Sequence, residues 1–261
     1  MNMKNKTLTT LFCSLLVTAA TAQNVENPMV TNGIKYLNTP YVAHTLEVND
    51  EEELVINTDE VDCTTFVEYV LAESLTPVVD GVVSEGQFAD NVIKVRYRNG
   101  KIDGYTSRLH YIAEWVNNGV QNGFLEDITA QKSTTTRPVE LSYMSSHPQL
   151  YKHLANHPED VARMKSIEQE LNKLTFHYLP KEQLKDNGMT WIKNGDIIAL
   201  CTNIPGLDVS HLGIAFYAEG KLTLLHASSQ KKKVVVSTHS LAQMLNADDK
   251  LIGIRVLRMK K

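Results

Sequence analysis

The sequence predicts an α+β fold in which a cysteine-bearing helix packs on an antiparallel sheet, with a mainly helical insertion between them. Three observations support this expectation. The stretch DCTTFVEYVLAESL at 62–75 has the apolar spacing of an amphipathic helix. Short β-like runs dominate the chain after Asn194-Gly195. Between these two regions, residues from about 85 to 190 contain several helical patterns.

Residues 1–22 have the composition of a secretory signal peptide. Lys4 and Lys6 precede the apolar run LTTLFCSLLVTAA, and Ala20-Thr21-Ala22 forms a small-residue cleavage site before Gln23. A membrane anchor is the alternative, but the apolar run is shorter than the ~20 residues that span a bilayer. We therefore expect an exported chain, periplasmic or extracellular, with no stable membrane anchor after cleavage.

The remaining residues, 23–261, are expected to form a single catalytic domain with an elaboration at about 85–190. This length is sufficient for a substantial core. The formal net charge of the whole chain is −4, and the signal segment removes two lysines and no acids. An acidic chain is a poor partner for nucleic acid, and the run Lys231–Lys233 is more simply a solvated hairpin end.

Two cysteines remain after the signal segment, Cys63 and Cys201. In an oxidising compartment they form either one disulfide or two separate thiols, and the sequence leaves both possibilities open. Cys201 lies in the apolar run GDIIALCT, where a buried hydrophobic thiol is the simpler interpretation. Cys63 directly follows Asp62, a natural N-cap, so it stands at a predicted helix start.

A second helix is predicted by SRLHYIAEWVNNG at 107–119. Arg108, Tyr111 and Trp115 form one stripe along it, which fits either ordinary packing or the wall of a binding site. The acidic run NDEEEL at 49–54 predicts a further short helix.

The segment 147–187 also reads as helical, because Pro158 suits a first helical turn and the apolar residues that follow keep helical phase. Its histidines stand among polar positions, and we expect them at the surface. They are His147, His153, His157 and His177.

The C-terminal β-like runs predict a meandering antiparallel sheet. They are 196–202, 210–217, 221–228, 232–238 and 250–259. The second and third runs form a hairpin, and a two-residue loop of Glu219 and Gly220 places Gly213 opposite His226. His211 and His226 then become diagonal neighbours on one face, ~7–8 Å apart along the backbone.

The histidine face of this hairpin also contains Gly213 and Ala215, whose small side chains leave room for the start of the cysteine helix. A thiol becomes a useful nucleophile when a helix N-terminus and a neighbouring imidazolium lower its pKa. Cys63, His211 and His226 would thus supply a nucleophile, a base and an orienting group.

These motifs resemble the NlpC-like peptidoglycan hydrolases, a bacterial branch of the papain-like superfamily. The resemblance rests on Asp62-Cys63, Gly195-Asp196, the strand Ser210-His211-Leu212-Gly213-Ile214, and His226 in LLHASS. The chain departs from the common form, because Thr64-Thr65-Phe66 follows the cysteine and a long segment separates it from His211. Over most of the mature chain, DCTTFVE, RLHY, SHLGIAF and LLHASS are similar to the N-acetylmuramoyl-L-alanine amidase-like family.

The resemblance implies a papain-like, NlpC-like core that hydrolyses an amide in peptidoglycan fragments or muropeptides through a thioester, with no cofactor. It assigns the nucleophile to Cys63, the general base to His211 and the orienting role to His226. The residues it suggests as substrate contacts are Thr64, Ser210, Arg108 and Tyr111, with Arg108 pairing a peptide carboxylate such as that of D-glutamate. The expected bond joins muramic acid to L-alanine, and the alternative is the γ-D-glutamyl bond to the diamino acid.

Three rival classes of protein fit these residues less well. A metal site from Cys201, His211 and His226 lacks an H-x-x-x-H motif or paired carboxylates. A serine hydrolase lacks a G-x-S-x-G motif. A non-catalytic envelope protein that only binds muropeptides is the stronger rival, because a protein can keep an enzyme's fold without its catalytic activity.

Overall fold

The structure is a computed structural model that describes residues 27–79 and 82–260. The predicted signal peptide lies outside the described residues. Within them, the longest apolar helices fall short of what a membrane crossing requires.

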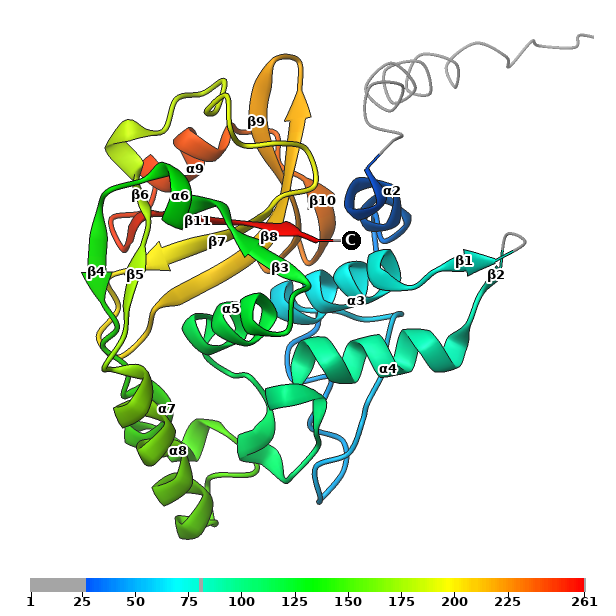
Figure 1. Cartoon of the computed structure of the whole chain (residues 1–261), viewed down its shortest axis with the longest axis vertical. Coiled ribbons are helices and arrows are strands. Elements are labelled where there is room, and N and C mark those ends of the chain that lie inside the picture. The colour runs from blue at the N-terminus through cyan, green and yellow to red at the C-terminus, as the bar shows by residue number, and fades with distance from the viewer. Residues whose placement is uncertain (1–26, 80–81, 261) are drawn as a thin grey trace, which may run out of the picture.

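The first half of the described chain is mainly helical, and most of the strands lie in the second half (Figure 1). The α-helices are α2 (Pro28–Lys35), α3 (Cys63–Leu75), α4 (Glu85–Arg96), α5 (Ile112–Gln121), α6 (Ile128–Lys132), α7 (Tyr143–Ser146), α8 (Pro158–Leu171) and α9 (Leu241–Asn246). Single 3₁₀ turns cover Arg98–Gly100, Tyr105–Ser107, Pro148–Leu150 and Lys181–Gln183. The strands are β1 (Val78–Val79), β2 (Val82–Val83), β3 (Leu125–Asp127), β4 (Thr136–Pro138), β5 (Thr175–His177), β6 (Leu179–Pro180), β7 (Ile197–Thr202), β8 (Val209–Ala218), β9 (Lys221–Ser228), β10 (Lys233–Val236) and β11 (Leu251–Met259).

In the described residues, one seven-stranded sheet carries the fold, in the order β10-β9-β8-β7-β11-β3 with β6 also paired to β11. Strands β7 to β10 follow one another as a meander, and β11 returns to the free side of β7. The recorded pairs in this sheet are antiparallel. The predicted α+β class and antiparallel meander are therefore confirmed.

Helix α3 begins at Cys63 and packs on one face of the sheet. Its buried side chains, among them Phe66 and Val70, share a core with Leu212 and Ile214 of β8. The opposite face of the sheet packs Ala215 and the β9 side chains of a second core against α9. The expectation that α3 approaches the face of Gly213 and Ala215 is therefore wrong. Large apolar side chains attract the helix, because they bury more area than small ones.

Two predicted helices differ in the structure. Helix α5 starts at Ile112 rather than near 107, because Arg108 forms an antiparallel bridge with Tyr97 and the Leu109 N–H donates to the Arg96 carbonyl. The acidic run at 49–54 is not helical. Its carboxylates instead bind side chains from elsewhere in the chain, which outweighs local helix propensity.

The segment 147–187 is helical only in part. Helix α8 begins at Pro158 as predicted, and it packs with α7 in a third core. After it, β5 pairs with β4 and β6 pairs with β11, so the helical prediction is wrong from 175 to 180. His153, expected at the surface, is only 7% exposed because it stacks on Tyr105.

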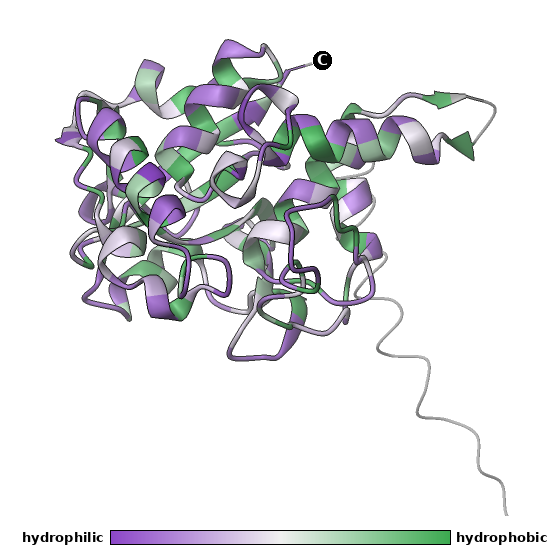
Figure 2. Cartoon of the chain, turned by 90° about the horizontal axis from the view of Figure 1, so that it is seen from below, coloured by the Kyte–Doolittle hydropathy of each residue, from purple (hydrophilic) through white to green (hydrophobic). Residues whose placement is uncertain are grey.

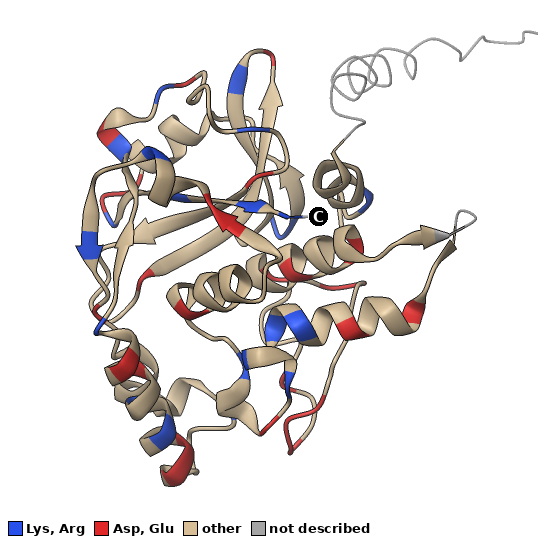
Figure 3. Ribbon diagram, in the orientation of Figure 1, with Lys and Arg blue, Asp and Glu red and all other residues tan. Residues whose placement is uncertain are grey.

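The surface of the molecule has two notable features. The β1–β2 hairpin projects beyond the end of α3, and its residues are hydrophobic (Figures 1 and 2). Lys and Arg are interspersed with Asp and Glu along the elements (Figure 3).

A buried ion pair between Glu68 and Arg96 joins α3 to α4 and is expected to stabilise the fold. The Arg96 Nε lies 2.7 Å from the Glu68 carboxylate, and both side chains are almost fully buried. Breaking such a pair leaves an uncompensated charge, so Glu68→Ala should lower the free energy of unfolding by about 3–5 kcal/mol. Glu68→Gln keeps an acceptor for Arg96 and should lose less. Urea unfolding of both variants checks this, and equal losses would contradict it.

Candidate active site

The thiol of Cys63 is placed by the cap of α3. Asp62 Oδ1 accepts the N–H groups of Thr64 and Thr65 at 3.0 and 2.8 Å, and the Thr65 hydroxyl accepts the Asp62 N–H at 2.9 Å. This capping box confirms the predicted helix start. The cap does not use the N–H of Cys63 itself; this N–H and that of Leu212 favour the thiolate and oppose the effect of burial on the thiol pKa.

The recorded pairing of β8 and β9 ends close to Leu212. The recorded β8–β9 pairs run from Ala218↔Lys221 to Ile214↔Leu225 and stop. Their register confirms the predicted two-residue loop. Glu219 and Gly220 have φ values of 51° and 74°, the left-handed pair of a tight hairpin turn.

His211 and His226 meet at the separated end of the hairpin. His211 Nε2 lies 2.7 Å from His226 Nδ1, and the rings stand nearly perpendicular. The predicted pairing of the two histidines is thus confirmed. The bond occupies Nε2 of His211 and leaves Nδ1, the nitrogen nearer the backbone, without a recorded partner. Among residues 27–79 and 82–260 no hydrogen bond joins the Cys63 thiol to either imidazole.

Burial controls the protonation of all three groups. It raises the pKa of the Cys63 thiol to about 11, with Asp62 adding to the effect and the Leu212 N–H opposing it. It lowers the pKa of His211 to about 3, with His226 adding to the effect. It lowers the pKa of His226 to about 4. Near neutral pH, the free protein therefore holds a neutral thiol and two neutral imidazoles.

These shifts predict an acid sensitivity of folding. The unfolded chain takes up protons below the ordinary histidine pKa of 6.5, whereas native His211 and His226 resist them until about pH 3 and 4. Stability should therefore fall as the pH drops below 6.5, by up to about 1.4 kcal/mol per pH unit for each histidine. Urea unfolding at several pH values measures this slope.

The control for this prediction is the double variant His211→Asn with His226→Asn. Its slope between pH 6.5 and 5 should be flatter than that of the wild type. His110, whose pKa burial lowers to about 3, keeps its own contribution in both proteins. If the unfolding free energy of the two proteins depended equally on pH, the acid sensitivity could not be assigned to His211 and His226.

A cavity of about 270 Å³ lies beside the start of α3, lined by Asp62, Thr64, Glu68 and Arg108 among others. Thr64 and Arg108, both predicted substrate contacts, thus meet in one place. A second cavity of about 580 Å³ is lined by Ser210 and the two histidines, together with residues of α9. The residues on either side of Cys63, Asp62 and Thr64, line the first cavity, and His211 lines the second.

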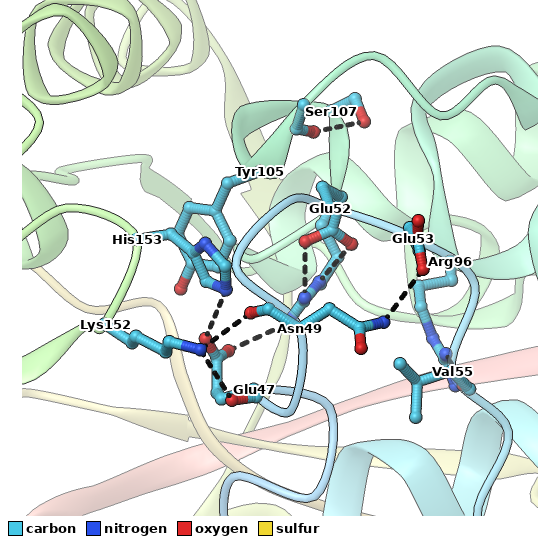
Figure 4. Close-up of polar contacts among 12 residues, drawn as sticks. Glu47, Asn49, Glu52, Glu53, Val55, Arg96, Tyr105, Ser107, Lys152 and His153 are labelled. Atoms are coloured by element: carbon cyan, nitrogen blue, oxygen red, sulfur yellow. Dashed lines mark hydrogen bonds and ion pairs between the residues drawn. The ribbon is translucent and has the colours of Figure 1, made fainter.

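Arg108 is held by two glutamates from the loop that precedes α3. Its guanidinium contacts Glu52 at 2.6 and 3.1 Å and Glu47 at 3.0 Å. Glu47 also lies 3.3 Å from His153, whose neighbour Lys152 contacts the same loop (Figure 4). A substrate carboxylate would therefore compete with Glu47 and Glu52 for Arg108.

Tyr111 and Trp115 do not form a wall of the site. The Tyr111 hydroxyl donates to Glu168 at 2.7 Å and accepts the Met144 N–H at 2.9 Å. Both side chains are buried, at 2% and 1% exposure. Of the two interpretations of this stripe, packing holds for these residues, and the assignment of Tyr111 as a substrate contact is wrong because its hydroxyl is already satisfied in the interior.

Sequence reasoning missed Tyr41. Burial raises the pKa of Tyr41 to about 12, and the charges of Cys63 and Asp62 add to the rise. Its backbone pairs with Val61 in a parallel bridge. An isolated tyrosine in a loop gives no periodic signal, so only the tertiary contact could reveal it.

The two cysteines are separate free thiols. Cys201 is fully buried on β7, where burial raises its pKa to about 12. Cys63 stays partly accessible to solvent. This supports the simpler interpretation of Cys201 and leaves Cys63 as the accessible thiol.

The fold and the site define an α+β protein that presents a thiol at a helix start, beside two hydrogen-bonded histidines of an antiparallel sheet. The chain belongs to the N-acetylmuramoyl-L-alanine amidase-like family, which it matches over residues 31–254. This confirms the family resemblance, and it supports an amidase-like enzyme of peptidoglycan.

Solved structures agree with this family. An N-acetylmuramoyl-L-alanine amidase from Bacteroides uniformis ATCC 8492 is 66% identical, with a TM-score of 0.89 over 90% of this chain and 100% of that one. A Bacteroides fragilis protein, provisionally named a xylanase, is 59% identical, with a TM-score of 0.86 over 88% and 99% of the two chains. A Legionella pneumophila protein at 22% identity shares the fold, with a TM-score of 0.67 over 95% and 94%. A comparison with curated proteins finds no match.

Proposed function

We propose that this protein is an exported, cysteine-dependent amidase with a papain-like, NlpC-like catalytic core. Its substrate is the amide bond between the muramic acid lactyl group and L-alanine in peptidoglycan fragments. The observation that carries the proposal is the hydrogen bond between His211 and His226, one residue from Leu212, whose N–H opposes the rise of the Cys63 thiol pKa.

The tautomers follow from the histidine pair. For His211 to accept a proton at Nδ1, its Nε2 must carry a hydrogen and donate it to His226 Nδ1. His226 then carries its own hydrogen on Nε2. Both rings are neutral in this arrangement, in agreement with their lowered pKa values.

The reaction would begin with transfer of the Cys63 thiol proton to His211 Nδ1 as the sulfur attacks the lactyl carbonyl carbon. The carbonyl oxygen gains negative charge near the N–H groups of Cys63 and Leu212, which favour negative charge on the sulfur in the free protein. The C–N bond then breaks as His211 returns the proton to the amine of L-alanine.

Hydrolysis of the thioester completes the cycle. His211 takes a proton from water, the hydroxyl adds to the thioester carbon, and the C–S bond breaks to free the muramic acid carboxylate. The sulfur recovers its proton from His211. His226 keeps the ring in place throughout, without changing its own charge.

The experiment is mass spectrometry of purified muropeptides after incubation with residues 23–261 or with the Cys63→Ala variant, under reducing conditions. Both intact muropeptides and peptides without sugar are used. Release of free stem peptide by the wild type alone supports the muramoyl amidase. Cleavage within the peptide supports the γ-D-glutamyl endopeptidase instead, and no product on either substrate contradicts both and favours a binding role.

A further inference from the structure

Asp208 is a buried carboxylate that lies three positions before His211 and is 6% exposed. Its Oδ2 accepts the N–H of Ala113 at 2.5 Å, and its Oδ1 accepts the N–H of Val209 at 2.9 Å. Its carbonyl accepts the N–H of Thr202 at 3.1 Å. One residue thus binds the end of β7, the start of β8 and the first turn of α5.

The strand is irregular where Asp208 holds it. Leu200 pairs with His211 and Cys201 pairs with Val209, so Ser210 is an extra residue without a partner on β7. Such a bulge bends the strand and redirects the side chains that follow it. The direction of the His211 ring therefore depends on how firmly the bulge is held at its open end.

The hydrogen bond from the Ala113 N–H to Asp208 ties the start of β8 to the first turn of α5. The N-cap of α5, Tyr111, makes no side-chain cap bond. The carboxylate of Asp208 takes that place from a different part of the chain, where the positive end of the helix dipole favours a negative charge. Helix α5 directly follows the segment that holds Arg108, so Asp208 ties the histidine strand to a wall of the first cavity.

We propose that Asp208 is a positioning residue, which holds the bulge at Ser210 so that His211 Nδ1 faces the Cys63 thiol. This inference rests on the proposed function. Both carboxylate oxygens bind backbone N–H groups, and no hydrogen bond joins them to Cys63, His211 or His226 among the described residues. Asp208 therefore acts through His211 and does not touch the reacting atoms.

The test compares Asp208→Asn with a matched control, Asp127→Asn. Asp127 caps α6 through the Ala130 N–H and pairs with the buried Arg255, so the same exchange there should also cost stability. The readouts are kcat and KM on muropeptides, and the rate of iodoacetamide alkylation of Cys63 against pH. All are measured below the unfolding temperature of each variant.

We expect Asp208→Asn to lower kcat and the alkylation rate at neutral pH at least tenfold, with KM unchanged within about twofold. Asp127→Asn should match the wild type in both. A folded Asp208→Asn protein with wild-type kcat and alkylation overturns the proposal. An equal loss in Asp127→Asn also overturns it, because the effect would then follow from lower stability alone.

If Asp208→Asn does not fold, the variant Ala113→Pro provides a second test of the same hydrogen bond. It removes the N–H that Asp208 accepts from α5, at a first-turn position that tolerates proline. Loss of kcat in this variant supports the proposal, and wild-type kcat overturns it. If the wild type itself cleaves no muropeptide, the proposed function fails, while the alkylation comparison still decides the role of Asp208.

Discussion

Replacing Cys63 by alanine is expected to lower kcat/KM on muropeptides by at least about 10⁴-fold, the loss typical of removing a covalent nucleophile. This size of effect is expected because Cys63 is the partly accessible thiol at the start of α3, where its own N–H and that of Leu212 favour the thiolate. Without it, the histidine pair can activate only a water. Initial rates of product release, followed by mass spectrometry, measure the loss.

The matched control is Cys201→Ala, which removes the other free thiol. Cys201 lies on β7 in the third core, and no hydrogen bond joins it to His211 or His226 among the described residues, so this variant should keep wild-type kcat/KM at temperatures where it is folded. Iodoacetamide should also add one group to the folded wild type and none to Cys63→Ala. A Cys201→Ala variant as inactive as Cys63→Ala would contradict the assignment of the nucleophile.

The parts of the site that the sequence predicted are those encoded by short-range patterns. The start of α3 follows from Asp62, whose side chain can cap only the residues directly after it. The position of His211 relative to His226 follows from the turn of Glu219 and Gly220, because a hairpin loop fixes the register of both strands. Neither inference needed the rest of the chain.

The parts that the sequence could not predict depend on long-range contacts. Arg108 leaves the helical pattern because its backbone pairs with Tyr97 and its side chain binds Glu52. Tyr111 is buried because α7 and α8 cover it, although its spacing alone also fits a binding wall. His153 is buried against a residue from a different loop, so its polar sequence neighbours gave the wrong indication.

The sequence also could not predict which face of the sheet α3 covers. Both faces of β8 and β9 are apolar, so alternation alone could not tell which one the helix covers. The small residues on the histidine face suggested the wrong choice. The proposed chemistry depends instead on the end of β8 beyond the last recorded β8–β9 pair, where His211 and His226 meet.

Replacing His211 by alanine is expected to lower kcat by about 10²- to 10⁴-fold with little change in KM, the range of a lost general acid–base group. His226 should be tested by two variants, His226→Asn and His226→Ala. Asparagine can still accept the Nε2 hydrogen of His211, whereas alanine leaves it unpaired, so His226→Asn should retain more activity. Equal losses in the two His226 variants would contradict an orienting role.

The pH dependence of Cys63 alkylation distinguishes two mechanisms for this site. A preformed thiolate–imidazolium pair would give a plateau between the two pKa values. Here burial raises the pKa of the thiol to about 11 and lowers that of His211 to about 3, so the neutral pair is favoured. We therefore expect His211 to take the thiol proton as iodoacetamide reacts, so that the wild-type rate between pH 5 and 8 depends on His211, and we expect the rate to rise further as the pH approaches the pKa of the thiol. A His211→Ala variant with the wild-type alkylation rate between pH 5 and 8 would contradict this role of His211.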